Sequence, residues 1–326
     1  MPTTSRLRHR ARRRSALTRE PHQQAVRELT ALGPAAPLVP AAATAAQEQL
    51  EWWLLHTTAW PPEPVPVPLG IERVTPLVDG LDLHLTDDSR YLRWFTRVVL
   101  PTVKDGAVHG IPGLRVVLDH GGAPVLHLAG TNAQVRLRGF PTALWRESVD
   151  AAREDFALSG FRPLWTAPLE ATTAPEAELA PWFSPDAGPR PFRIASALLR
   201  RVGLFAAAGT TACLTGWTTW GTFREGWKFD FEFIPGHRPD HDRLLSMLTD
   251  PDDGLPLRIT ARSCNRCPGP EASCRVNLVA TDGTPGEVTL LFRTTEEEVV
   301  RAWEQRWPAA FARIRTAWGT GGAPKH

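Results

Sequence analysis

The chain has 326 residues, of which 42% are hydrophobic, and a formal net charge of +2 at pH 7. A chain of this size can bury one or two full cores and needs neither disulfides nor a partner to become stable. Residues 1–30 hold eight arginines against two glutamates, so the rest carries 29 basic and 33 acidic side chains. A mildly acidic body has no broad positive field, which argues against duplex binding by the globular part.

The N-terminal segment is rich in arginine between residues 6 and 14. No apolar run of the kind that defines a signal peptide follows it, so we expect a cytoplasmic protein. The composition predicts a disordered basic tail over residues 1–44. This tail is either a solvated arm, an overextended translation start, or an arm that contacts nucleic acid through residues 6–14.

Residues 45–160 are predicted to form a first α+β domain. Leu50, Trp53 and Leu54 follow helical spacing and predict a helix over residues 45–58. The pair Asp79-Gly80 predicts a hairpin turn before an alternating strand over residues 81–85. Further predicted elements are a helix ending before Pro101, strands near residues 114–118, 124–128 and 133–137, and a helix over residues 141–156.

The order of elements repeats in the second half of the chain. Residues 161–191 contain seven prolines and are predicted to be an extended linker, and residues 319–326 a disordered tail. Residues 192–318 are predicted to form a second α+β domain with a cysteine-containing hairpin. The expected fold is therefore α+β in two similar halves, each a mainly antiparallel sheet packed with helices, and the repeat suggests an internal duplication.

One uncharged stretch, Gly203 to Phe223, raises the question of a membrane span. It contains four glycines and six threonines and no dense run of leucine, isoleucine or valine. Insertion of such a segment is weakly driven. We therefore expect buried strand with turns here and no membrane association.

Three of the four cysteines fall within eleven residues, in a predicted hairpin. Cys264 and Cys267 form a Cys-x-x-Cys knuckle, and Cys274 on the returning strand can supply a third ligand to a structural zinc ion. The fourth ligand is then Cys213, His237 or His241. A Cys264–Cys274 disulfide and unpaired thiols are the two alternatives.

Aromatic residues gather near the predicted strands of the second half, and Arg266 lies inside the knuckle. Exposed tryptophans can stack on bases or hold an apolar ligand, whereas buried ones only complete a core. The predicted binding residues are Arg266, Trp217, Trp220 and Trp227.

A cluster of His237, Asp240, His241 and Asp242 offers imidazole and carboxylate groups for acid–base chemistry. The same residues also suit the start of a helix, because aspartates stabilise the positive end of its dipole. The sequence has no Walker loop, Rossmann glycine fingerprint, Gly-x-Ser-x-Gly elbow or His-Glu-x-x-His helix.

These observations favour a noncatalytic binding or regulatory protein that presents a two-domain surface to a protein or peptide partner. The first alternative is a zinc-containing, nucleic-acid-associated protein that uses the arginine-rich tail, the knuckle with Arg262, Arg266 and Arg275, and exposed tryptophans. The second alternative is an enzyme with its site around His237, Asp240 and His241.

Overall fold

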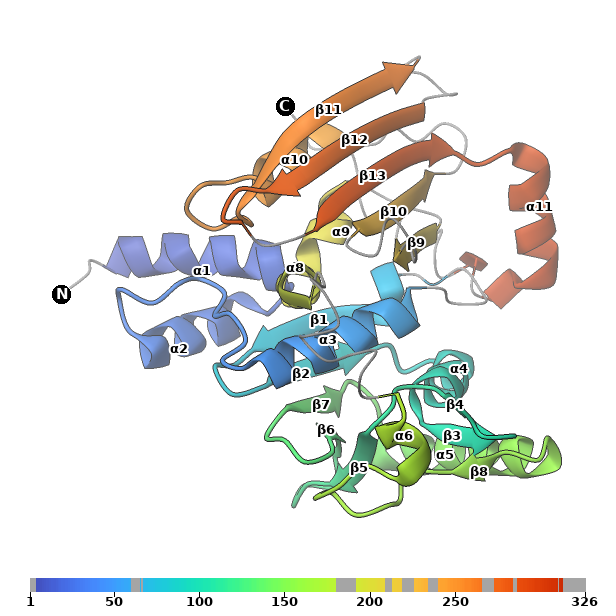
Figure 1. Cartoon of the computed structure of the whole chain (residues 1–326). Helices are drawn as coiled ribbons and strands as arrows, with labels where there is room; N and C mark the ends of the chain where they lie inside the picture. The colour runs from blue at the N-terminus through green and yellow to red at the C-terminus, as the bar shows by residue number, and fades with distance from the viewer. Residues whose placement is uncertain are drawn as a thin grey trace. The chain divides into compact units, whose positions relative to one another are not determined.

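The computed structural model describes residues 4–59, 65, 67–179, 192–208, 213–218, 226–233, 240–265, 273–283, 286–309 and 311–312. Helices and mostly antiparallel sheets alternate along the chain and confirm the α+β class (Figure 1). Contacts divide the chain into two compact units. Unit 1 comprises Met1–Thr58 and Ile71–Val202, and unit 2 comprises Ala59–Gly70 and Gly203–His326.

Unit 1 is built on a five-stranded sheet with the order β1-β2-β7-β6-β5. The pairs are antiparallel except β2 with β7, which is parallel. The turn at Asp79-Gly80 closes as predicted, since the Leu77 amide donates to the Gly80 carbonyl at 3.1 Å. The strands are β1 (Ile71–Pro76), β2 (Leu81–Leu85), β5 (Leu114–Leu118), β6 (Pro124–Leu128) and β7 (Gln134–Arg138).

Helices cover the apolar face of this sheet. That face exists because buried apolar residues alternate with more exposed residues along the strands. Leu81, Leu83 and Leu85 of β2 are buried, whereas the residues between them are half-buried. Asp88 caps a helix by accepting from the Arg90 amide at 2.9 Å, as its position before the helix predicts. The helices are α3 (Ala45–Thr58), α4 (Ser89–Val99) and α5 (Thr142–Leu158), and a small sheet is formed by β3 (Thr102–Lys104), β4 (Ala107–His109) and β8 (Arg162–Pro163).

The N-terminal segment differs from the disordered tail expected over residues 1–44, because it forms α1 (Thr4–Thr18) and α2 (His22–Leu32). The physical reason is that part of its charge is satisfied inside the protein. Arg14 is fully buried, its Nε donates to Glu20 at 2.6 Å, and its Nη1 donates to the Leu38 carbonyl at 3.0 Å. Arg6, Arg8 and Arg12 remain exposed.

The described part of the predicted linker is also folded into unit 1. Residues 161–179 contain β8 and the short helix α6 (Ala174–Ala177). Leu164 and Trp165 are buried, and Glu176 forms a buried ion pair with Arg115 in β5 at 2.8 Å. This segment therefore covers the edge of the sheet. Residues 180–191 of the predicted linker and the predicted tail 319–326 lie outside the described residues.

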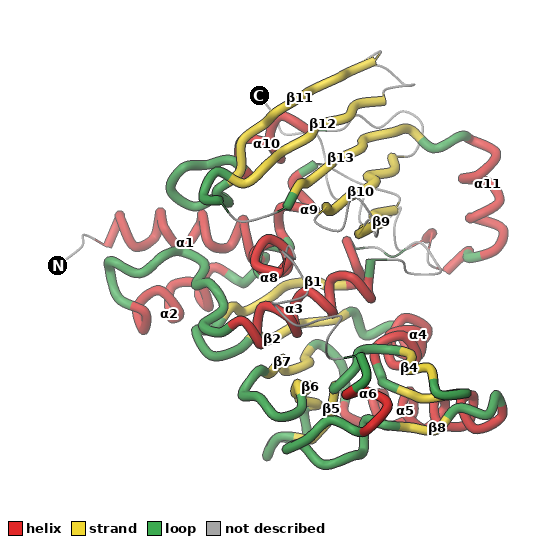
Figure 2. Tube along the Cα trace, viewed as in Figure 1, coloured by secondary structure: helices red, strands yellow, loops and turns green. Residues whose placement is uncertain are grey.

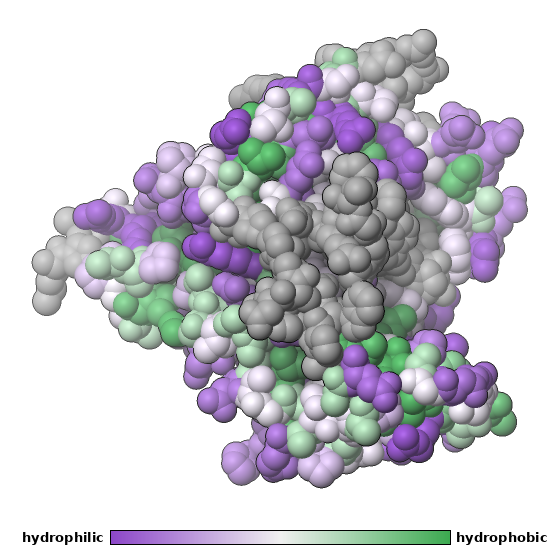
Figure 3. Space-filling view, in the orientation of Figure 1, coloured by the Kyte–Doolittle hydropathy of each residue, from purple (hydrophilic) through white to green (hydrophobic). Residues whose placement is uncertain are grey.

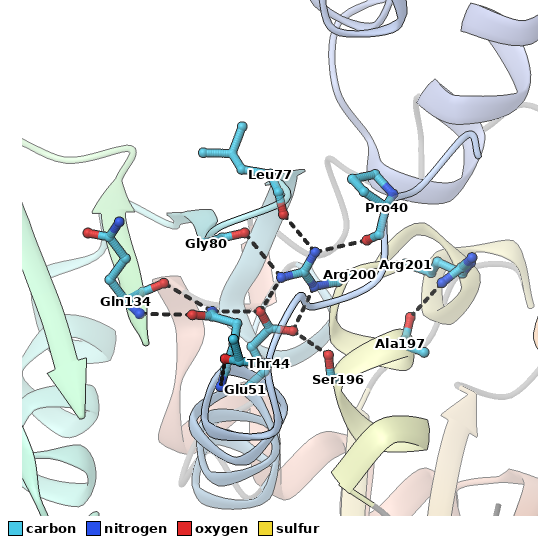
Figure 4. A network of polar contacts seen from close by, with 11 residues as sticks. Pro40, Thr44, Glu51, Leu77, Gly80, Gln134, Ser196, Ala197, Arg200 and Arg201 are labelled. Atoms are coloured by element: carbon cyan, nitrogen blue, oxygen red, sulfur yellow. Dashed lines mark hydrogen bonds and ion pairs between the residues drawn. The ribbon is translucent and has the colours of Figure 1, made fainter. Parts of the chain in front are cut away.

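Helix α8 (Phe192–Leu199) was expected to open the second domain, but it groups with unit 1. Arg200 at its end donates to both carboxylate oxygens of Glu51 in α3, at 2.8 and 2.7 Å. Its Nη1 also donates to the carbonyls of Pro40 and Leu77, each at 2.8 Å (Figure 4). This network joins the helix to the first domain across 149 positions of sequence.

Unit 2 contains a second five-stranded sheet, with the order β11-β12-β13-β10-β9 (Figure 2). Here β10 and β13 are parallel and the other neighbours antiparallel. The strands are β9 (Cys213–Thr218), β10 (Gly226–Phe233), β11 (Leu257–Asn265), β12 (Ser273–Ala280) and β13 (Glu287–Thr294); the helices are α9 (Gly203–Ala207), α10 (His241–Leu248) and α11 (Glu297–Arg306).

The two sheets share one topology. When β1, β2, β5, β6 and β7 are matched in sequence order with β9 to β13, strand order and strand directions agree throughout. In both units a helix separates the second strand from the third, and another follows the last. The two halves are therefore alike in architecture, and an internal duplication as their origin stays a prediction.

The core of unit 2 is formed by an alternating aromatic strand. Trp227, Phe229, Phe231 and Phe233 of β10 are buried, and the residues between them face outward. On that outer face hydrophilic residues gather over β12 and β13 (Figure 3). This alternation of buried and outward-facing residues along β10 is typical of a strand with one face in the core. Among the described residues, no helix is long and apolar enough to cross a membrane.

Candidate metal centre

Cys264 and Cys274 lie on neighbouring antiparallel strands of unit 2. In the β11–β12 pairing they are directly opposite each other. Side chains of an opposed pair lie on the same face of a sheet. Cys274 is buried, so Cys264 faces the same side as the core even though it is exposed at the edge. The predicted hairpin thus brings two of the three clustered cysteines together.

The third member of the group is His241, the first residue of α10. The helix begins there because Asp240 caps it and accepts from the Arg243 amide at 3.1 Å. The imidazole is 7% exposed, and its ring meets the Phe292 ring edge-on at 5.7 Å between centroids. Capping and aromatic packing thus fix the imidazole over the two cysteines.

The ligand atoms of His241, Cys264 and Cys274 all lie within 4.8 Å of one another. The Cys264 Sγ and His241 Nε2 atoms are 3.7 Å apart. Tetrahedral zinc with ordinary Zn–S and Zn–N bonds sets sulfur and nitrogen about 3.5 Å apart and two sulfurs about 3.8 Å apart. The group is therefore close enough to hold a metal ion after small side-chain rotations.

The pKa of His241 is lowered from its usual value, chiefly because burial disfavours the charged imidazolium, with a smaller effect of the same sign from Arg262. The neighbouring Asp242 and Asp240 act in the opposite direction. The net effect favours the neutral ring, which has a lone pair for coordination.

Arg262 is the charged residue closest to this group. Its Nε donates to Cys264 Sγ at 3.4 Å, its Nη2 lies 3.1 Å from His241 Nε2, and its Nη1 lies 2.8 Å from Asp242 Oδ1. The hydrogen bond to Cys264, and after it that to Asp242, raises the pKa of Arg262 above its usual value. A metal ion bound to His241 Nε2 would displace the guanidinium from the imidazole, and Asp242 is positioned to retain it.

Of the other predicted ligands, Cys213 does not join the group. The main chain of Cys213 lies in β9, and two strands, β13 and β10, separate it from β12. At a strand spacing of about 4.8 Å this is roughly 14 Å, too far for a shared ion. Cys267 and His237 lie outside the described residues.

Of the predicted binding residues, only Trp227 has a described side chain. It is 1% exposed, and its ring stacks on that of Phe229 with 5.8 Å between centroids. Trp227 is therefore a core residue, which is one of the two roles that the sequence left open for the tryptophans. Trp217 is described only as backbone in β9, and Trp220 and Arg266 lie outside the described residues.

The acid–base cluster of the enzyme alternative is placed at a helix start. Asp240 is the N-cap of α10, and Asp242 in the first turn is 70% exposed and paired with Arg262. Asp240 and Asp242 are thus occupied in capping and in an ion pair. His241, the other described member of the cluster, lies close to the cysteines.

Sequence reasoning identified His241 as one of three candidates for the fourth ligand, and it named Arg262 only as a nucleic-acid contact beside the knuckle. The spacing of residues in the hairpin already indicates that Arg262 lies beside Cys264. Arg262 precedes Cys264 by two positions, so both side chains lie on the same face of an extended strand.

No protein-family model, curated protein or solved structure matches this chain.

Proposed function

We propose that unit 2 is a noncatalytic binding module in which His241, Cys264 and Cys274 hold one zinc ion. The observation that carries the proposal is the approach of the three ligand atoms to within 4.8 Å. Two thiolates and one imidazole form a donor set that suits zinc better than magnesium or calcium, which prefer oxygen ligands. Cys267, predicted from the knuckle spacing, is the proposed fourth ligand.

The role of the metal is to brace the hairpin that joins β11 and β12. The two strands are held by their ladder, but β11 is the edge strand of the sheet, and its register shifts between Ile259 and Ala261. A bulged edge strand is bonded on one side only. A zinc ion that joins α10, β11 and β12 would stabilise this edge.

The braced edge is the proposed contact surface for a protein or peptide partner. Ile259 is 42% exposed, and Arg258 and Arg262 flank it along the same strand. An apolar residue between two arginines suits a partner with acidic and apolar side chains.

The test is the zinc content of protein purified under reducing conditions without added metal. Wild type is expected to contain about one equivalent, and Cys264→Ser, Cys274→Ser and His241→Ala are each expected to lose it. Cys213→Ser is the matched control, because the sheet order places that residue far from the group. Wild type without zinc, or equal loss in the Cys213 variant, would refute the proposal.

The nucleic-acid alternative is supported by one observation in unit 1. Helix α1 has no acidic residue, and Arg6, Arg8 and Arg12 are exposed on it. Three phosphate contacts would give a slope of about −2 to −3 in a plot of log affinity against log salt. Replacing these three arginines by glutamine should abolish that slope, and salt-independent binding would exclude the alternative.

A further inference from the structure

The opposed cysteines of the β11–β12 hairpin have the geometry of a disulfide as well as that of a metal site. Directly opposed residues of antiparallel strands have Cα atoms about 4.5–5.5 Å apart. This distance lies within the range that disulfides span without backbone movement. The Sγ atoms of Cys264 and Cys274 already lie within 4.8 Å of each other, so rotation of the side chains alone can bring them to bonding distance.

We infer that Cys264 and Cys274 are a peroxide-sensitive pair whose disulfide excludes the metal ion from the His241 site. The inference rests on the proposed function for its metal and on the hairpin register for its disulfide. Both sulfurs would be bonded to each other in the oxidised form. His241 and the proposed ligand Cys267 would then be the two ligands left of four, and two ligands do not complete the tetrahedral set that a structural zinc ion requires.

The two cysteines differ in ways that assign them different steps. Cys264 is exposed and accepts a hydrogen bond from Arg262 Nε at 3.4 Å, whereas Cys274 is 1% exposed. A dissolved oxidant therefore reaches Cys264 first. The thiolate is the form of a cysteine that attacks the oxidant.

The chemistry needs hydrogen peroxide as the oxidant and proceeds in two steps. The Cys264 thiolate attacks one peroxide oxygen, the O–O bond breaks, and a sulfenic acid and one water form once a proton is taken up. The Cys274 thiolate then attacks the Cys264 sulfur, the S–O bond breaks, and the oxygen leaves as a second water. Two thiols lose two electrons in total and the peroxide gains them.

The sequence around the pair allows a clean measurement. Trypsin cleavage after Arg262, Arg266 and Arg275 places Cys264 on the peptide 263–266 and both Cys267 and Cys274 on the peptide 267–275. In a Cys267→Ser variant the second peptide retains Cys274 alone. A link between the two peptides in that variant can then only be Cys264–Cys274.

The experiment treats metal-free, full-length Cys267→Ser protein and zinc-loaded wild-type protein, which keeps the proposed ligand Cys267, with hydrogen peroxide, and blocks remaining thiols before digestion. The expected result is the 263–266 to 267–275 link in both proteins, with about one zinc released per link from the wild type and full reversal by dithiothreitol. The Cys274→Ala variant should form no such link. Cys264 and Cys274 recovered as blocked or singly oxidised thiols would overturn the inference.

The metal-free arm separates the two proposals. A link in metal-free protein together with zinc-free wild type would refute the zinc site and leave the disulfide intact. Zinc that stays bound while the link forms would overturn the claim that the disulfide excludes the metal. Zinc present in wild type, with no link in either form, would overturn the disulfide and leave the zinc site standing.

Discussion

Arg200 and Glu51 form a two-pronged ion pair in the interior of unit 1. Nε donates to Oε2 at 2.8 Å and Nη2 donates to Oε1 at 2.7 Å, and neither side chain has any solvent exposure. Ser196 donates to the same carboxylate, and the remaining guanidinium protons reach backbone carbonyls. The pair is therefore fully satisfied, and a single substitution leaves a buried charge without its partner.

Replacing Glu51 by Gln, or Arg200 by Met, should lower the free energy of unfolding of unit 1 by about 3–5 kcal/mol, because removing one partner leaves the other charge buried. The measurement is urea unfolding. The matched control is Arg97→Gln, which breaks a pair with Asp155 whose side chains are 54% and 44% exposed, and should cost less than about 1 kcal/mol. Equal effects would show that burial is not the decisive difference.

Two arginines of α1 should respond differently to truncation. Arg14 is fully buried and paired with Glu20 at 2.6 Å, whereas Arg12, two positions earlier, is exposed. Arg14→Ala should therefore destabilise unit 1 by about 3 kcal/mol, and Arg12→Ala should change it by less than about 0.5 kcal/mol. Thermal unfolding followed by fluorescence measures both, and an unchanged Arg14→Ala midpoint would restore the disordered-tail interpretation.

Gly139, directly after β7, and Gly160, two positions after α5, both have positive φ but differ in the space around them. Gly139 has φ +98° and a Cβ there would collide with the Leu85 backbone, whereas Gly160 has φ +75° and open space around it. Gly160→Ala should cost about 1–2 kcal/mol from the left-handed backbone alone. Gly139→Ala should cost clearly more, about 3 kcal/mol or above. Chemical denaturation compares the two variants directly.

Unit 1 should lose stability in mild acid because two half-buried histidines are held in neutral form. Burial lowers the pKa of His56 to about 4, and burial with Arg73 and Arg138 lowers that of His84 to about 4. The unfolded chain takes up these protons near pH 6.5, so stability falls as the pH drops from 6.5 toward 4.

The same stability should level off above about pH 7.5, because the unfolded-state histidines have then lost most of their protons. Unfolding free energies measured across the range should show a shallower acid slope for His84→Gln than for wild type. An identical slope in the variant would contradict the assignment to His84.

Arg262→Gln should strengthen zinc binding to the proposed site by roughly five- to tenfold. The guanidinium lies 3.1 Å from His241 Nε2, so it competes for the ligand and repels a divalent cation. Competition with a chromophoric chelator measures the affinity. Arg258→Gln, on the same strand but four positions away, serves as the control and should change the affinity little.

Several strands and helices of unit 1 could be predicted from the sequence with good boundaries, whereas α1, α2, α6 and the small sheet of β3, β4 and β8 were not predicted. The helix over residues 45–58 and the strands over 81–85, 114–118 and 124–128 have the predicted bounds. The period-two and helical spacings of apolar residues reflect which side chains are buried locally. Asp79-Gly80 forms a turn and Asp88 caps a helix, and both do so through neighbouring backbone groups. These signals need no knowledge of distant residues.

The candidate site could be predicted in part for the same reason. A hairpin places Cys264 opposite Cys274 by local strand pairing alone. The choice of His241 over Cys213 required the position of α10 and the order of strands in the sheet, which local patterns do not encode.

The sequence by itself determined the α+β class, the alternation of the strands and the pairing of the two cysteines, because each depends on residues close together in the chain. The tertiary structure decided whether the charged segments fold. Arg14, Glu176 and Arg200 look like surface charges in the sequence, but each is buried with an oppositely charged partner. A charge is stable in the interior only when its partner arrives with it, and two of these partners lie 61 and 149 positions away along the chain.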